Sequence, residues 1–114
     1  MNTVNTVKIG NLGENKAARY LVLHGYKIID RNFRCRYGEI DIICEKHGAL
    51  IFVEVKKRAN DLFGGGAAAV DERKRERIIK TAQIYLLNSD SEREIRFDVI
   101  EITGRRINHI KNAF

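Results

Sequence analysis

The stretch from Gly38 to Arg58 reads GEIDIICEKHGALIFVEVKKR and predicts a β-hairpin. Two runs rich in isoleucine, valine and phenylalanine flank His47-Gly48, a pair that suits a two-residue turn because both residues tolerate a positive φ. We therefore expect strands over Gly38–Glu45 and Ala49–Lys57. This hairpin would form the centre of the fold.

The register of the hairpin would place charged groups side by side. With a two-residue loop, Asp41 lies directly opposite Glu54, at a Cβ separation of roughly 5 Å. Glu54 and Lys56 are two residues apart in one strand, so their side chains project from the same face. Two carboxylates that close repel each other, and a divalent cation or Lys56 would compensate. Carboxylates and a lysine suit metal-dependent phosphodiester cleavage, whereas a surface hairpin with solvated acids is the alternative interpretation.

Size and composition indicate one globular domain over residues 1–114, with 44% hydrophobic and 32% charged residues. No apolar run is long enough to span a membrane, and the N-terminal MNTVNTVKIGN lacks the apolar segment of a signal peptide. We therefore expect a cytoplasmic protein without a membrane partner. Cys35 and Cys44 have no zinc-site spacing, and we expect no disulfide in a reducing compartment.

The net charge of +6 and the pI of about 9.5 favour an anionic partner, with nucleic acid foremost. The basic residues gather in clusters on both sides of the acidic hairpin, an arrangement that suits a phosphate backbone running past a metal site. Each cluster taken alone would also fit a solvated face. The expected nucleic-acid contacts are Arg34, Arg36, Lys57, Arg58, Arg73, Lys74 and Arg77.

The remaining chain predicts an α/β (α+β) fold with the order α-β-β-β-α-β-β and a mixed sheet flanked by helices. Asp71 is the expected N-cap of the second helix, because its side chain can accept a hydrogen bond from the first turn. The expected elements outside the hairpin are a helix over 11–24, a strand over 26–36, a loop over 60–69, a helix over 71–87, and strands over 94–102 and 107–111.

Two polar residues lie on or beside the apolar stripes of the helices. Glu14 lies on the buried stripe of the first helix, where an acid is unusual, although the positive end of the helix dipole would also favour it there. Gln83 borders the core stripe of the second helix, which we expect to comprise Ile78, Ile79, Ala82 and Leu86. A surface amide is the alternative interpretation for Gln83.

An acid on a first helix, then Asp41, then Glu54-Val55-Lys56 across a hairpin and a following helix, resembles the PD-(D/E)XK nuclease superfamily. Within it the chain is most similar to the small bacterial YraN-type proteins, which are themselves similar to archaeal Holliday junction resolvases. The resemblance covers nearly the whole chain, and Arg34 to Arg58 is its most specific part. It is carried by Gly13-Glu14, Gly25-Tyr26, Asn32-Phe33-Arg34-Cys35-Arg36, Gly38-Glu39-Ile40-Asp41-Ile42-Ile43, Phe52-Val53-Glu54-Val55-Lys56, Phe63-Gly64 and Arg96-Phe97-Asp98-Val99.

The resemblance implies a restriction-endonuclease-like core and a metal-dependent endonuclease that cuts nucleic acid, with branched DNA as the substrate by analogy. Asp41 and Glu54 would bind Mg²⁺ or Mn²⁺, with the Val55 carbonyl as a third oxygen ligand and Lys56 as the catalytic lysine. Glu14 would be the additional acid of resolvase-like members, able to bind a second ion or its water shell. Gln83 is similar in place to a glutamine that many such nucleases carry.

Three alternatives about function and assembly stay open from the sequence. The basic clusters would equally suit a nucleic-acid-binding module without catalysis. The acids could instead make structural ion pairs in a protein-interaction or assembly subunit. Because resolvases that cut symmetrically act as dimers, a homodimer is also compatible with the resemblance.

Overall fold

The computed structural model describes residues 12–58, 70–88 and 92–114 of the chain. The predicted order of elements is confirmed, and each element begins and ends within one residue of its predicted limit. The loop predicted over residues 60–69 lies outside the described residues. The elements are helix α2 (Leu12–Leu23), strands β1 (Lys27–Cys35), β2 (Gly38–Lys46) and β3 (Ala49–Arg58), helix α3 (Glu72–Leu87), and strands β4 (Ile95–Thr103) and β5 (Arg106–Ile110).

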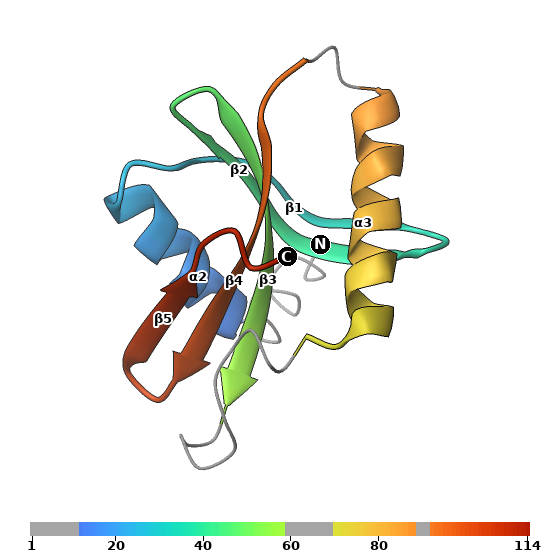
Figure 1. Cartoon of the computed structure of the whole chain (residues 1–114). Coiled ribbons are helices and arrows are strands. Elements are labelled where there is room, and N and C mark those ends of the chain that lie inside the picture. The colour runs from blue at the N-terminus through green and yellow to red at the C-terminus, as the bar shows by residue number, and fades with distance from the viewer. Residues whose placement is uncertain (1–11, 59–69, 89–91) are drawn as a thin grey trace, which may run out of the picture.

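The strands form one mixed sheet in the order β1-β2-β3-β4-β5, shown in Figure 1. All neighbouring strands are antiparallel except β3 and β4, which are parallel, so the chain between them must return along the sheet. Helix α3 lies in this connection. The fold is therefore α+β, and its sheet with two helices is compatible with a restriction-endonuclease-like core.

The central strand β3 is buried on both faces, because each helix covers one of them. Ile51 and Val53 pack with Ala17 and Leu21 of α2. The alternate residues of β3 pack on the other face with α3: Leu50 and Phe52 contact Ile78 and Ala82. Side chains that alternate along β3 thus point toward different helices, which decides the direction of the charged residues at its end.

The core of α3 differs from the prediction at one position. Ile79 was expected in the core stripe, but it is 38% exposed, so that expectation is wrong. The buried residues of α3 are Ile78, Thr81 and Ala82. Successive helical residues are about 100° apart, so a stripe centred between these three leaves Ile79 at its margin.

The β2–β3 hairpin has the predicted turn and the predicted register. His47 and Gly48 have φ values of +53° and +83°, so both central residues of the turn lie in the left-handed region. Lys46 pairs with Ala49, and the ladder continues in step to Ile42 and Val53. Pairing of β2 with β3 ends there, just before the two predicted carboxylates.

Strand β1 departs from a regular extended conformation at Asn32. The pairs on either side place Asn32 opposite Asp41. Asn32 has a φ of +56°, a left-handed conformation that asparagine tolerates better than most residues. On one side of this point Ile42 packs toward α2, whereas Ile40 packs toward α3. A regular strand would place these two residues on the same face, so both strands twist at the level of Asp41.

No helix among the described residues is long and apolar enough to cross a membrane.

A buried polar network stabilises the two C-terminal strands. The Asp98 side chain is fully buried and accepts two hydrogen bonds of 2.8 Å from Arg96, one of 2.7 Å from His109 Nε2 and one of 3.0 Å from the Asn112 N–H. Burial acts to raise the pKa of Asp98, but these hydrogen bonds outweigh it, so the pKa lies below its ordinary value. Asp98 is therefore an ionised, fully bonded structural carboxylate.

Replacing Asp98 with asparagine should destabilise the fold by about 3–5 kcal/mol, because it leaves the Arg96 guanidinium without its anionic partner. Since the native pKa of Asp98 is lowered, its contribution is present above the unfolded pKa of about 4 and is lost as the pH falls through the native value. Urea denaturation of wild type and Asp98→Asn at about pH 7 and about pH 3.5 measures both effects. The difference should shrink at the lower pH.

The matched control is Glu39→Gln, since Glu39 pairs with an Arg34 side chain that is 73% exposed. That change should cost no more than about 1 kcal/mol. Equal losses in the two variants would contradict the structural role of Asp98.

Candidate active site

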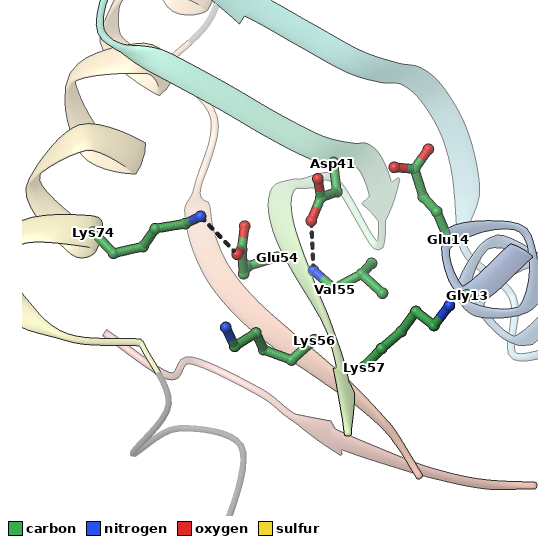
Figure 2. A pocket seen from close by; sticks show the side chains of 8 residues that line it. All are labelled: Gly13, Glu14, Asp41, Glu54, Val55, Lys56, Lys57 and Lys74. Atoms are coloured by element: carbon green, nitrogen blue, oxygen red, sulfur yellow. Dashed lines mark hydrogen bonds and ion pairs between the residues drawn. The ribbon is translucent and has the colours of Figure 1, made fainter. Parts of the chain in front are cut away.

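A cavity of about 360 Å³ opens where β2 stops pairing with β3, between the start of α2 and the start of α3 (Figure 2). The structure brings together four of the five residues predicted to be catalytic, namely Glu14, Asp41, Glu54 and Lys56. The predicted ligand Val55 lines the same cavity. The complete lining comprises Gly13, Glu14, Asp41, Glu54, Val55, Lys56, Lys57 and Lys74.

Asp41 is fixed by a hydrogen bond that replaces the missing strand pairing. The Val55 N–H donates to Asp41 Oδ2 at 2.8 Å, as Figure 2 shows. Burial is the main cause that raises the pKa of Asp41 to about 7, and the charge of Glu54 adds to it, while the Val55 hydrogen bond opposes the shift. Without a cation, Asp41 therefore binds a proton at a higher pH than an ordinary aspartate does.

Glu54 points from β3 toward α3 and is 7% exposed. Its Oε2 lies 3.3 Å from Nζ of Lys74 on the first turn of α3. That turn is fixed by its N-cap, since Asp71 Oδ1 accepts a hydrogen bond of 2.8 Å from the Lys74 N–H. The predicted N-cap is thus confirmed. It also fixes the backbone of Lys74, whose ammonium group faces Glu54.

Glu14 enters the cavity from α2 and is also 7% exposed. Its Oε1 accepts three hydrogen bonds from β1: 3.1 and 2.9 Å from Nε and Nη2 of Arg31, and 3.0 Å from Asn32 Nδ2. The sequence indicated the unusual burial of Glu14 but not these partners. A buried carboxylate is costly unless it is paired or hydrogen-bonded, so its burial implies a partner without identifying which residue.

Lys56 and Lys57 leave β3 on opposite faces, so they approach the cavity from different sides. The stem of Lys57 passes over Gly13, where an added Cβ would lie 2.5 Å from Lys57 Cδ and 2.7 Å from Cγ. Gly13 therefore leaves the space in which Lys57 reaches the rim of the cavity. A larger residue at position 13 would push Lys57 aside.

The oxygen atoms around Asp41 suit a hard divalent cation. Carboxylates, backbone carbonyls and water are the ligands that Mg²⁺ and Mn²⁺ prefer. The N–H of Val55 points away from β4 to Asp41, and in an extended strand the carbonyl of the same residue faces the same edge. Asp41, Glu54 and this carbonyl thus supply three oxygen donors from two strands.

Among the residues that the structure describes, no three His, Cys, Asp or Glu side chains come close enough together to hold a metal ion by themselves. Arg31 and Asn32 occupy one oxygen of Glu14, and Lys74 occupies one oxygen of Glu54. The donor set that fits a cation therefore combines two side chains with one backbone carbonyl.

The predicted nucleic-acid contacts are dispersed around the cavity. Lys57 and Lys74 line it, and Arg73 and Arg77 are exposed on the first half of α3. The remaining predicted contacts have partners of their own: Arg34 binds Glu39 at 3.0 Å, Arg36 lies over the ring of Tyr37, and Arg58 pairs with the buried Glu101.

Gln83 is the predicted catalytic residue that the structure does not bring to the cavity. It is exposed and lies more than two helical turns beyond Lys74 on α3. The residue of α3 that lines the cavity is Lys74. The sequence could not distinguish the two positions, because the direction in which α3 crosses the sheet was unknown.

A family model described as "Uncharacterised protein family UPF0102" matches residues 13–102. This chain belongs to UPF0102. The match extends from the start of α2 to the end of β4 and so includes every residue that lines the cavity. The YraN-type family resemblance is thereby confirmed.

UPF0102 relatives match over nearly their whole length. The UPF0102 protein of Persephonella marina is 48% identical over 106 residues, which cover 92% of this chain and 91% of the relative. The UPF0102 protein of Caldanaerobacter subterraneus subsp. tengcongensis is 43% identical, with both chains fully covered. The UPF0102 protein of Clostridium tetani is 46% identical over all of this chain and 98% of its own.

The raised pKa of Asp41 predicts that Asp41→Asn stabilises the protein in neutral to alkaline solution without divalent cations. A carboxyl group whose native pKa exceeds its unfolded value loses stability as the pH rises from about 4 to about 7. The asparagine carbonyl can still accept the Val55 N–H. We expect a gain on the order of 1–3 kcal/mol in the free energy of unfolding at about pH 8.5.

Urea denaturation with EDTA present measures this gain. It should disappear at about pH 4, where wild-type Asp41 is protonated in both states. A variant less stable than wild type at about pH 8.5 would show that the Asp41 carboxylate is already compensated in the fold.

Proposed function

We propose that this chain is a metal-dependent endonuclease that hydrolyses phosphodiester bonds of nucleic acid. The observation that carries the proposal is the convergence of Asp41, Glu54 and Lys56 in one cavity at the end of β3. Holding the half-buried Asp41 beside the buried Glu54 costs free energy that a bound cation would offset. Together with the sequence resemblance, this arrangement supports the PD-(D/E)XK assignment.

Asp41, Glu54 and the Val55 carbonyl would hold Mg²⁺ or Mn²⁺. When bound, the ion would polarise the phosphoryl group and lower the pKa of a coordinated water. Lys56 projects from the same face as Glu54 and would orient the attacking water or stabilise negative charge on the phosphate. Arg31 binds one oxygen of Glu14, and the other oxygen of this carboxylate would bind the water shell of the ion.

The charges around the cavity support nucleic acid as the substrate. Lys57 and Lys74 stand on different sides of the acids, and Arg73 and Arg77 extend the positive surface along α3. A polyanionic strand could follow these cations with one phosphate at the acids. DNA, and branched DNA in particular, is proposed by analogy with resolvases, and a homodimer would suit paired cuts.

A non-catalytic nucleic-acid-binding module is the second candidate. It is favoured by the protein partners that the acids already have, since Lys74 lies on Glu54 and Arg31 lies on Glu14. Such a module would bind nucleic acid with a strong salt dependence and no metal requirement. Metal binding therefore separates the two candidates.

Replacing Asp41 with alanine should abolish both Mn²⁺ binding and cleavage, because it removes one of the two carboxylates that we assign to the metal. Lys56→Ala should retain metal binding and lose at least about 100-fold in cleavage rate, as for removal of one group that stabilises transition-state charge. Isothermal titration calorimetry measures the first effect, and gel assays with linear, flapped and four-way DNA measure the second.

The control for both variants is Glu39→Gln, which changes an exposed ion pair outside the cavity lining and should cut at the wild-type rate. Metal-independent DNA binding by wild type, with no Mn²⁺ uptake even when DNA is present, would refute the nuclease and support the binding module.

Removing the two exposed arginines of α3 should reduce the salt dependence of DNA binding. Each phosphate contact contributes about 0.9 to the slope of log K against log salt for duplex DNA, so Arg73→Gln combined with Arg77→Gln should lower the slope by about 1.8. Fluorescence anisotropy with EDTA present measures it.

The matched control is Lys27→Gln combined with Lys111→Gln, which removes the same charge at the opposite end of the sheet. If both double variants lower the slope equally, net charge and not the α3 surface governs binding.

A further inference from the structure

Lys74 forms an ion pair with Glu54, one of the two acids that we propose bind the metal directly. Its Nζ lies 3.3 Å from Glu54 Oε2, and both side chains line the cavity (Figure 2). The N-cap bond from Asp71 fixes the backbone of Lys74 at the start of α3. The start of the helix thus fixes the backbone of Lys74, whereas its long side chain can move between different partners.

The two partners differ in exposure. Glu54 is held between β3 and α3, with a side chain that is 7% exposed, whereas the Lys74 side chain is 46% exposed. A lysine has four rotatable bonds and one compact charge, so its ammonium group can move several ångströms without any backbone movement. Glu54 has no such freedom. Any exchange at this pair therefore occurs by movement of Lys74.

The Glu54 carboxylate lies between the lysine and the position that a cation would take beside Asp41. An ammonium group and a divalent cation close to one carboxylate repel each other, and the low dielectric of a buried site strengthens that repulsion. Lys74 is also the residue of this ion pair that a phosphate group in the cavity would attract. The same side chain thus faces two alternative anions, Glu54 and a substrate phosphate.

We propose that Lys74 is a positioning residue that couples metal binding to nucleic-acid binding. In the free protein it acts as the counterion of Glu54 and weakens metal binding; when a phosphate enters the cavity, Lys74 moves to it and leaves Glu54 to the metal. This inference rests on the proposed function. It adds that the site completes its metal coordination only with nucleic acid present.

Linkage makes the proposal quantitative. If nucleic acid tightens Mn²⁺ binding by a given factor, Mn²⁺ must tighten nucleic-acid binding by the same factor. Couplings of this kind are typically about 5–150-fold. Removing the charge of Lys74 should abolish most of this factor, because the residue that transmits it is gone.

Mn²⁺ binding to wild type, Lys74→Met and Lys27→Met provides the test, with free Mn²⁺ counted by its EPR signal. Each protein is titrated alone and with a saturating four-way DNA junction on ice. Lys74→Met alone should bind Mn²⁺ at least about 5-fold more tightly than wild type alone. DNA should tighten binding to wild type and leave Lys74→Met nearly unchanged.

Lys27→Met removes the same charge from an exposed lysine at the opposite end of the sheet, outside the cavity lining and the proposed nucleic-acid surface. It should bind Mn²⁺ like wild type and retain the effect of DNA. Lys74→Arg, which keeps the charge, should also resemble wild type. A tightening shared by Lys27→Met would mean that overall charge is the cause, and the proposal would be overturned.

The remaining outcomes separate this inference from the proposed function. If wild type binds Mn²⁺ and Lys74→Met binds it equally or more weakly, Lys74 does not compete for Glu54 and only the inference fails. If DNA tightens Mn²⁺ binding to Lys74→Met as strongly as to wild type, the coupling does not pass through Lys74. If no variant binds Mn²⁺, with or without DNA, the metal-dependent nuclease fails and the inference fails with it.

Discussion

The hydrogen bond from the Val55 N–H to the Asp41 carboxylate is the interaction on which the rest of the site depends. Pairing of β2 with β3 ends at Ile42 and Val53, while β3 continues beside β4 to Arg58. The backbone groups on the free edge of β3 therefore need partners, since buried and unbonded amides are costly. Asp41 satisfies one of them, and in doing so its side chain is held beside Glu54.

This arrangement brings acids together, and the surrounding elements compensate for their charge. Arg31 reaches Glu14 from β1, and Lys74 reaches Glu54 from α3. Asp41 instead accepts a hydrogen bond from a backbone N–H, and its pKa is raised to about 7. The three acids thus differ in how far the protein itself satisfies them. The least compensated carboxylate lies centrally, where a cation could contact both strands.

The sequence predicted what local rules determine. The positive φ values tolerated by His47 and Gly48 set the hairpin register, and that register placed Asp41 and Glu54 together. The N-cap at Asp71 was equally local. The pairs that complete the site were not predictable in this way: Arg31 is 17 residues from Glu14, and Lys74 meets Glu54 only through the path of α3. The partial exposure of Ile79 and the exposure of Gln83 depend on the same placement of α3 on the sheet.

Asp98 and Asp41 differ in how fully the fold offsets the charge of their carboxylates. Asp98 has its oxygens bonded by Arg96, His109 and the Asn112 N–H, and its pKa is lowered despite complete burial. Asp41 is half-buried beside Glu54, accepts a hydrogen bond from the Val55 N–H, and has a raised pKa. The same fold thus offsets the charge of Asp98 fully and leaves the charge of Asp41 in the cavity only partly offset. Carboxylates with raised pKa values gather at functional sites, and we propose a divalent cation as the ligand because its charge and its preference for oxygen suit Asp41 and Glu54.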